Sequence, residues 1–424
     1  MHEVITLSNG VRILTEHMPN VRSAAIGFFI GVGSRHETDF ENGAAHFIEH
    51  MLFKGTTTRS ASALAKEMDA LGGQVNAYTT KESTCFYARC LDTHLDRTIS
   101  LLCDMLFCST FEQENVLLER GVILEEIDMY EDTPEDLCAE QLSMAIYQDT
   151  PLGRPILGKA STLSQMDGDW LRTWHDNHYC STSIVVSLAG SFTDAHVQTL
   201  IDYLNALPKR QRSEQIPSSY RPAVTIREKA IEQNHLILAF PGMPFSDPRR
   251  YQLILLNSIL GGGCSSRLFQ ELREQRGLCY TIYSYLSDYV DTGFVGIYAA
   301  LGQEQEQMAL DTIASIVQTL AEHGPSQEEL TRVKEQTKAN ILMGTESVQA
   351  RMSHMGVSTL SYGRIKEIEE ILDAYDQITC AQLKCLAQEI FTFSNASFSG
   401  VGQIQSNDYY QHWLSTHEKA NIIK

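Results

Sequence analysis

The stretch GAAHFIEHMLFKG, residues 43–55, carries three neighbouring ionisable side chains on an otherwise apolar segment. They are His46, Glu49 and His50, and on a helix the positions i, i+3 and i+4 lie on one face. The apolar residues around them predict a buried helix, in which three ionisable groups are costly unless something pairs with them. A divalent metal ion would do so, bound by the two imidazoles with the carboxylate beside it to handle a water molecule. The order is the reverse of the HExxH zinc motif, and the alternative is a polar patch satisfied within the helix core.

A catalytic zinc site also needs a third protein ligand and one position open to water. The predicted helix at 112–130 offers Glu119 and Glu126, which are seven residues apart and therefore share a face. Val122 and Ile123 lie between them on that face. We therefore expect both carboxylates to point into the core.

Glu126 is the predicted third ligand, whereas Glu125 occupies a more polar side of the helix and is the weaker candidate. Glu119 lies one helical layer away, where it could support the site without binding the metal. The alternative for this helix is a solvated acidic stripe. That alternative accounts well for Glu112, Glu114 and Glu125. It accounts poorly for Glu119 and Glu126.

The chemistry of such a site is hydrolysis with one zinc ion per chain. Zinc would lower the pKa of a bound water and polarise the carbonyl of a scissile bond. Glu49 would take the proton from the water and pass it later to the leaving amine. A neutral histidine would serve less well as the base, because both histidines are committed to the metal.

The elements that must position these residues alternate between strand and helix patterns. In the first half, strand patterns occur at 22–32, 74–80, 84–90 and 182–190, and helical patterns at 43–54, 61–71, 94–108, 112–130 and 194–206. In the second half, strand patterns occur at 233–241, 279–301 and 395–401, and helical patterns at 248–260 and within 304–391. The two halves therefore look like diverged copies of one α/β unit.

Residues 207–222 (LPKRQRSEQIPSSYRP) are basic, polar and proline-bearing, which is typical of a linker. They predict a zinc-bearing catalytic domain at 1–208, a linker at 209–222 and a homologous domain without metal at 223–424. The second copy has NSILG, 257–261, where the first has HFIEH, so we expect it to lack the ligands.

The composition excludes several classes of partner. A formal net charge of −20 repels phosphate backbones and argues against a nucleic-acid partner. No uninterrupted apolar run approaches a membrane span, and the chain opens directly on a strand–turn–strand pattern without a leader-like segment. The ten cysteines include no CxxC pair, and many lie in apolar runs, as thiols of a reducing compartment do. We therefore expect a cytoplasmic protein with no membrane partner.

HFIEH, the spacing of 76 residues between His50 and Glu126, and ERGVILEE resemble the pitrilysin/insulinase family of zinc peptidases. The resemblance is closest to the mitochondrial processing peptidase β-subunit and its bacterial relatives. It extends over nearly the whole chain, through the segments GVGSRHETDFENGAAHFIEHMLFKGT, LGGQVNAYTTKEST, PLGRPILG and ILGGGCSSRLFQELREQRGLCYTIYS.

The resemblance implies roles for the residues already singled out. His46, His50 and Glu126 match the zinc ligands of the family, and Glu49 matches its general base. Glu119 matches an additional acidic residue that is important for activity.

It also implies substrate-binding residues and an architecture. Asn76 and Ala77 match an edge strand that takes the substrate as an added strand. Arg273 and Tyr280 match second-half residues that reach the substrate, although from the residues alone they are read as a surface ion pair and a core aromatic. The implied fold class is α+β: two structurally repeated α/β domains, each a mixed, mostly antiparallel sheet flanked by helices, facing each other as a clam-like chamber. Family members of this size are often dimers, so we expect a homodimer.

The function that combines these inferences is a zinc-dependent metalloendopeptidase that cleaves peptides or unfolded, extended protein segments. The alternative is a non-catalytic peptide-binding or scaffold member of the same family. Such members typically lack parts of the motif, whereas this chain keeps all of it. A zinc hydrolase acting on non-peptide substrates is disfavoured only by the resemblance.

Overall fold

The computed structural model describes residues 2–210 and 216–420 of the chain. They form two units, neither of which is continuous in sequence. Unit 1 comprises Met1–Asp128, Arg154–Ile216 and Leu342–Lys366, and unit 2 comprises Met129–Gly153, Pro217–Ile341 and Glu367–Lys424.

The predicted linker at 209–222 lies partly outside the described residues, which omit 211–215. Its described flanks contain no helix or strand. The assignment of a catalytic domain to 1–208 and of a domain without metal to 223–424 stays a prediction.

Unit 1 is built on a six-stranded sheet with the strand order β1-β2-β6-β3-β5-β4. The strands are β1 (His2–Thr6), β2 (Arg12–His17), β3 (Ser23–Ile30), β4 (Gln74–Thr79), β5 (Thr84–Leu91) and β6 (Ile184–Gly190). The β2–β6 pair is parallel, and the other neighbouring pairs are antiparallel. This is the mixed, mostly antiparallel sheet that we expected.

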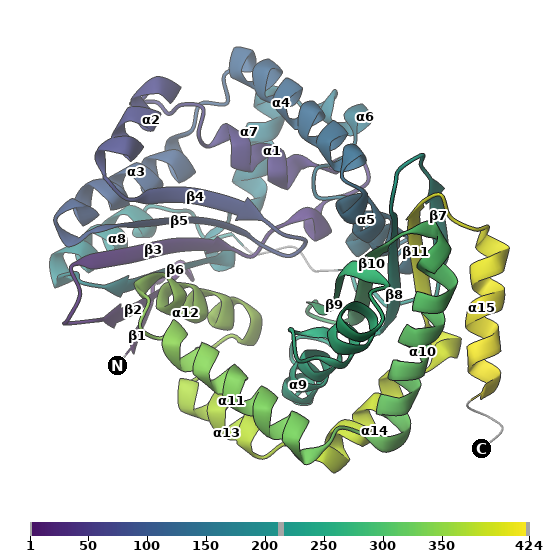
Figure 1. Cartoon of the computed structure of the whole chain (residues 1–424). Helices are drawn as coiled ribbons and strands as arrows, with labels where there is room; N and C mark the ends of the chain where they lie inside the picture. The colour runs from purple at the N-terminus through teal and green to yellow at the C-terminus, as the bar shows by residue number, and fades with distance from the viewer. Residues whose placement is uncertain (1, 211–215, 421–424) are drawn as a thin grey trace. The chain divides into compact units, whose positions relative to one another are not determined.

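β3 is apolar on both faces because both faces of the sheet are covered. Successive side chains of a strand point to opposite sides. Ile26 and Phe28 join the core beneath the helices of the first half, whereas Ala25 and Phe29 pack in a second cluster with residues of α12 (Val348–Tyr362). Figure 1 shows α12, in green, against these purple strands, with α2 and α3 on their other side.

Helices of the first half lie close to the predicted ranges 43–54, 61–71, 94–108, 112–130 and 194–206, and further helices lie outside those ranges at 134–146, 160–163 and 168–178. They are α1 (Ala44–Met51), α2 (Ala61–Ala70), α3 (Leu95–Cys108), α4 (Gln113–Asp132), α5 (Pro134–Ile146), α6 (Ala160–Leu163), α7 (Gly168–His178) and α8 (Asp194–Asn205). Short 3₁₀ turns occupy Ser34–His36, Asp92–His94, Pro151–Gly153, Ser181–Ser183, Gln303–Gln305 and Phe393–Asn395.

Unit 2 is built on a five-stranded sheet with the order β7-β11-β8-β10-β9. Its strands are β7 (Val224–Glu228), β8 (Asn234–Pro241), β9 (Cys279–Asp288), β10 (Gly293–Leu301) and β11 (Ser397–Gly402). The helices of the second half are α9 (Arg250–Gly261), the π-helical η5 (Phe269–Gln275), α10 (Glu306–His323), α11 (Gln327–Gly344), α12, α13 (Ile368–Asp376), α14 (Cys380–Ile390) and α15 (Asn407–Ala420).

The two sheets confirm the predicted internal repeat. The order β2-β6-β3-β5-β4 matches β7-β11-β8-β10-β9 strand for strand, and the single parallel pair occupies the same place in each. One helix of each half covers the other half's sheet: α5 packs on β8 and β11 in unit 2, and α12 packs on β3 and β6 in unit 1.

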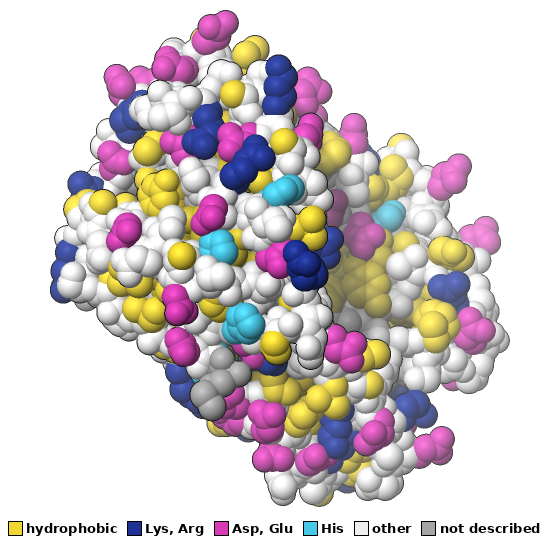
Figure 2. Space-filling model, turned by 90° about the vertical axis from the view of Figure 1, so that its left-hand side faces the viewer, with side chains coloured by type: hydrophobic (Ala, Val, Ile, Leu, Met, Phe, Trp, Pro, Cys, Tyr) yellow, Lys and Arg dark blue, Asp and Glu magenta, His cyan; other side chains and the backbone are white. Residues whose placement is uncertain are grey.

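The structure also shows how charged side chains are distributed on one face and how apolar the helices are. Acidic and basic side chains are interspersed over the face in Figure 2 rather than gathered by sign into one patch. None of the helices in the described residues combines the length and apolarity that crossing a bilayer requires.

Candidate metal centre

The N-terminus of α1 is held in place by one buried carboxylate, Glu37. Its oxygens accept hydrogen bonds from the backbone N–H groups of Gly43 (2.9 Å) and Ala45 (2.8 Å) and from the Asn42 side chain (3.0 Å). Burial raises the pKa of Glu37 to about 7 against the opposing effect of these donors. The first turn of the helix is thereby tied to the preceding loop.

α1 presents the three predicted side chains on one face. His46 is buried, and Glu49 and His50 are half-buried. The two imidazole rings lie with their centroids 4.6 Å apart. The apolar residues of the helix are buried around them, as predicted: Ala44, Ala45, Phe47, Ile48 and Met51.

α4 brings Glu126 against both histidines. Its Oε2 atom lies 3.6 Å from His46 Nε2 and 3.7 Å from His50 Nε2, and the three ligand atoms all lie within 4.8 Å of one another. These separations are too long for hydrogen bonds. They suit a shared ion, because zinc–ligand bonds of about 2.0–2.2 Å in a tetrahedral site put the ligand atoms roughly 3.3–3.6 Å apart. The donor set and its spacing therefore fit one zinc ion.

The electrostatics of the group favour the metal-binding form of His46. Burial, with His50 as a second cause, lowers the pKa of His46 to about 3. A neutral imidazole is the form that binds a metal ion. In the described part of the chain, no other set of three His, Cys, Asp or Glu side chains converges in this way.

Glu49 lies beside the two histidines and is held by a strand. Thr79, the last residue of β4, donates a hydrogen bond from Oγ1 to Glu49 Oε2 at 2.5 Å. Burial raises the pKa of Glu49, and the Thr79 hydrogen bond acts in the opposite direction. The hydrogen bond fixes one oxygen of the Glu49 carboxylate.

Glu119 lies behind His50 rather than beside the ligand atoms. Its Oε2 atom is 3.1 Å from His50 Nδ1, and its Oε1 atom is 2.6 Å from Lys54 Nζ. The Glu119 side chain is only 7% exposed. A carboxylate on the far nitrogen of a ligand histidine fixes the orientation and the tautomer of the ring.

The orientation of α4 favours Glu126 over Glu125 as the third ligand but differs from the prediction at Val122. Glu125 is exposed and Glu126 half-buried, as expected. Ile123 is fully buried, whereas Val122, predicted to share the inward face, is 49% exposed. The inward face of α4 turns through Glu119 and Ile123 to Glu126, and Val122 lies beyond its border.

The two predicted substrate-binding residues of the first half lie on β4, the outermost strand of its sheet. β4 pairs with β5 on one side only. Asn76 is exposed, and its Oδ1 atom accepts a hydrogen bond at 2.8 Å from the backbone N–H of Ala77. An edge strand of this kind presents main-chain groups that another strand could pair with.

Arg273 and Tyr280 lie in unit 2, at η5 and the start of β9. The Arg273 guanidinium stands over the Tyr280 ring, 4.6 Å from its centroid, and over the Phe269 ring at 4.8 Å. Tyr280 is 74% exposed, so it is not the core aromatic that the residues alone suggested. Stacking restricts the motion of both side chains.

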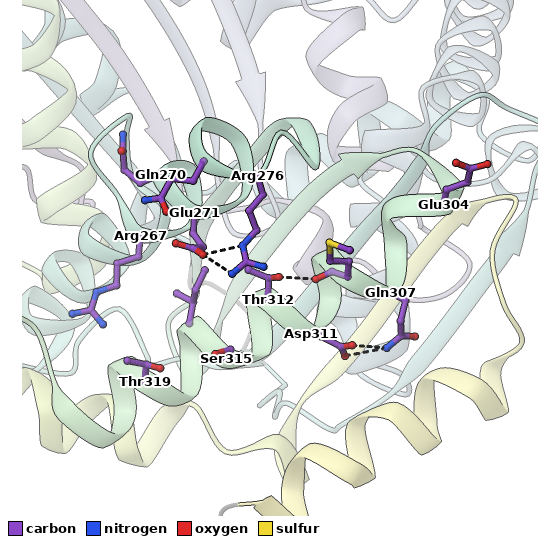
Figure 3. Close-up of a pocket in the computed structure, with 13 residues that line it drawn as sticks. Arg267, Gln270, Glu271, Arg276, Glu304, Gln307, Asp311, Thr312, Ser315 and Thr319 are labelled. Atoms are coloured by element: carbon purple, nitrogen blue, oxygen red, sulfur yellow. Dashed lines mark hydrogen bonds and ion pairs between the residues drawn. The ribbon is translucent and has the colours of Figure 1, made fainter.

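A cavity of about 950 Å³ lies in unit 2 between η5 and α10 (Figure 3), and its lining does not include His46, His50 or Glu126. Two pairs of its polar side chains interact with each other: Arg276 with Glu271 at 2.7 Å and Gln307 with Asp311 at 2.9 Å. None of the site residues predicted from the sequence lines it.

Sequence reasoning did not single out Lys54 or Thr79, although both touch a predicted site residue. Lys54 follows His50 by four residues, which places it near the same face, and that spacing could have found it. No local signal identifies Thr79, because its contact with Glu49 joins a helix to a strand 30 residues away.

Comparison with known proteins gives consistent matches. The model for the insulinase peptidase family M16 matches residues 12–160, and the model for the M16 inactive domain matches residues 166–337. The uncharacterized zinc protease YmxG of Bacillus subtilis is 42% identical over 405 residues, which cover 95% of this chain and 99% of the relative. An uncharacterized zinc protease of Streptomyces coelicolor is 39% identical over 410 residues, which cover 94% of this chain and 89% of the relative.

Two solved structures share the fold. A Pseudomonas fluorescens crystal structure described as a peptidase M16 inactive domain superposes with a TM-score of 0.89 at 20% identity, covering 96% of this chain and 99% of that one. The crystal structure of a protease from Helicobacter pylori superposes with a TM-score of 0.89 at 18% identity, covering 95% of this chain and 99% of that one.

Proposed function

This chain belongs to the insulinase family of peptidases, M16, and on that premise we propose that it is a zinc-dependent metalloendopeptidase acting on peptides or on unfolded, extended protein segments. One observation carries the proposal: His46 Nε2, His50 Nε2 and Glu126 Oε2 converge at the spacing of zinc ligands, with Glu49 on the same helix face. The names of the relatives, which call them zinc proteases, support zinc as the metal.

His46, His50 and Glu126 would hold the ion, which when bound lowers the pKa of a water molecule and polarises the scissile carbonyl. Glu49 takes the proton from the attacking water and returns it to the leaving amine. The Thr79 hydrogen bond holds Glu49 in position for both transfers. Glu119 keeps the His50 ring oriented through its Nδ1 atom.

The substrate is proposed to add as a strand to the free edge of β4. Backbone pairing holds an extended peptide with little demand on its sequence, which suits unfolded segments better than folded ones. A peptide strand there would replace the Asn76 side chain as the partner of the Ala77 N–H. Arg273 and Tyr280 are proposed to contribute to substrate binding as well.

The test is Glu49→Gln, with Glu125→Gln as the matched control because Glu125 is an exposed glutamate on α4. We expect Glu49→Gln to keep its zinc while cleavage of an unstructured peptide library falls by at least about 100-fold, the scale of general-base catalysis. The control should cleave as the wild type does, and a chelator should abolish cleavage. Undiminished cleavage by Glu49→Gln would refute the mechanism. Wild-type protein that binds peptides without cutting any would support the non-catalytic alternative.

We further propose that the protein acts in the cytoplasm as a homodimer. All ten cysteines are free thiols, which suits a reducing compartment. Sedimentation analysis of the purified chain tests the dimer, and a single species at the monomer mass would exclude it.

A further inference from the structure

The side chains of His50, Glu119 and Lys54 contact one another in that order, starting from the His50 ring nitrogen that does not face Glu126. Glu119 uses its two oxygens separately: Oε2 faces His50 Nδ1 at 3.1 Å, and Oε1 faces Lys54 Nζ at 2.6 Å. The ammonium group is therefore two contacts away from the ligand atom His50 Nε2. All three residues belong to unit 1.

The backbone of Lys54 is fixed at the point where its side chain can reach Glu119. α1 ends at Met51, and a further turn follows in which the Lys54 N–H donates to Met51 O at 3.0 Å. From α4, the Asn115 side chain donates to Lys54 O at 3.0 Å. Gly55 then adopts a φ of +124°, which side-chain-bearing residues rarely adopt, and turns the chain away. Lys54 is thus clamped between the helix of the histidines and the helix of Glu119.

Because Glu119 is buried, its carboxylate depends on the ammonium group of Lys54 for stabilisation. A buried carboxylate is costly unless an opposite charge and hydrogen bonds compensate for it. Lys54 supplies a full positive charge to one oxygen, and its own side chain is 34% exposed, so its ammonium stays partly hydrated. Without that charge, the carboxylate would gain by turning toward water and away from His50. The ring would then lose the acceptor that sets its orientation.

We propose that Lys54 is a positioning residue of the metal centre: it holds Glu119 in the rotamer that orients His50, and so raises the affinity for zinc without touching the ion. The assignment rests on the proposed zinc function. In this arrangement Lys54 influences the orientation of His50 only through its contact with Glu119.

The test measures zinc affinity directly, by competition with a chromophoric chelator on metal-free full-length protein. Lys54→Met keeps much of the aliphatic stem and removes the charge, and we expect zinc to bind about 10- to 100-fold more weakly, the usual effect of losing a group that supports a ligand. Lys54→Arg restores the charge and should bind within about threefold of the wild type. Lys338→Met, which removes the Lys338–Asp376 ion pair of unit 2, should not change zinc affinity.

A double-variant cycle separates positioning from a general loss of stability. If Lys54 acts only through Glu119, then Lys54→Met combined with Glu119→Gln should bind zinc no more weakly than Glu119→Gln alone. Losses that multiply in the double variant, or wild-type affinity in Lys54→Met, would overturn the proposal. The melting temperature of each metal-free variant reports folding, and Lys54→Gln is measured by the same criteria if Lys54→Met unfolds. Failure of the wild type to bind zinc would instead refute the proposed function.

Discussion

At the residue scale, each of the two carboxylates beside the metal group is held by a neighbour remote in sequence. Glu49 is held by Thr79 from β4, and Glu119 by Lys54 from the turn after α1. A carboxylate that must accept a proton or orient a ring is useful only in one rotamer, so the neighbour that fixes it contributes to function without touching substrate.

The Thr79 contact gives the first prediction. Thr79→Val keeps the shape of the side chain but removes the donor to Glu49, whereas Thr79→Ser keeps it. A hydrogen bond to a charged group contributes about 1.5–3 kcal/mol, so kcat of Thr79→Val should fall roughly 10- to 100-fold. KM and zinc content should hardly change, and Thr79→Ser should stay within about threefold of the wild type. Steady-state kinetics on a fluorogenic peptide decide the matter, and equal kcat values for the two variants would refute the role of Thr79.

At the element scale, the packing of α12 on the sheet depends on glycine. A Cβ atom on Gly356 would lie 2.1 Å from the Phe29 ring, whereas a Cβ atom on Gly121 of α4 would meet nothing within 4 Å. Both glycines are helical residues of unit 1. The same substitution should therefore have opposite effects at the two positions.

Gly356→Ala should lower the free energy of unfolding by roughly 1–3 kcal/mol, because the helix must move off β3 to accommodate the methyl group. Gly121→Ala should raise it by about 0.5–1 kcal/mol, because alanine loses less entropy in a helix and no atom obstructs it. Urea denaturation measures both. Shifts of the same sign would show that helix propensity, rather than contact with Phe29, controls Gly356.

The start of α11 gives a prediction about pH. Glu329 accepts hydrogen bonds from the Ser326 N–H (2.7 Å) and from Arg267 Nε (2.7 Å), and the Glu329 N–H donates to Ser326 Oγ (3.1 Å). The Arg267 hydrogen bond is the main cause that lowers the pKa of Glu329 to about 2. The folded state therefore favours the ionised form, and this stabilisation is complete above about pH 4.5 and is lost as the pH falls toward 2.

Glu329→Gln should consequently lower the free energy of unfolding by roughly 2 kcal/mol at pH 6 and by much less at pH 3. Glu328→Gln, at a neighbouring side chain that is 90% exposed, is the control and should have little effect at either pH. Urea denaturation across this range provides the measurement. A difference between wild type and Glu329→Gln that stays constant with pH would contradict the assignment.

At the scale of the whole molecule, the repeat of the sheet is not accompanied by a second metal-ligand group in the described residues. Five strands of the unit 1 sheet have the same order as the unit 2 sheet, yet the converging His, His and Glu side chains belong to unit 1. The helix after the equivalent strand of unit 2, α9, carries Asn257 and Ser258 where α1 carries its motif. Metal binding should therefore stabilise one unit and leave the other unaffected.

Hydrogen exchange with and without zinc tests this expectation. A ligand present at 100 times its Kd stabilises the state that binds it by about 2.7 kcal/mol. Removing zinc should accelerate exchange in α1 and α4 but not in β8 and β10. His46→Ala should show the metal-free pattern whether or not zinc is present. Equal acceleration in both units would mean that the metal stabilises more than its own unit.

The sequence by itself determined the local part of this structure. Strand alternation and helical periodicity located α1, α4 and the hairpin β4–β5, because these patterns reflect which face of each element is buried. The spacing of His46, Glu49 and His50 was enough to place them on one helix face, since helix geometry fixes that relation. The repeat of strand and helix patterns along the chain was also visible, whereas the order of the strands within each sheet came from the structure.

Only the tertiary structure decided how remote elements meet. The sequence does not show that α5 and α12 each cover the sheet of the other half. Nor does it show that Thr79 reaches Glu49, that Lys54 reaches Glu119, or that Val122 lies outside the inward face of α4. A sequence pattern specifies which side chains leave water, whereas the packing of one element on another specifies which atoms they meet, and the chemistry of this centre depends on the second.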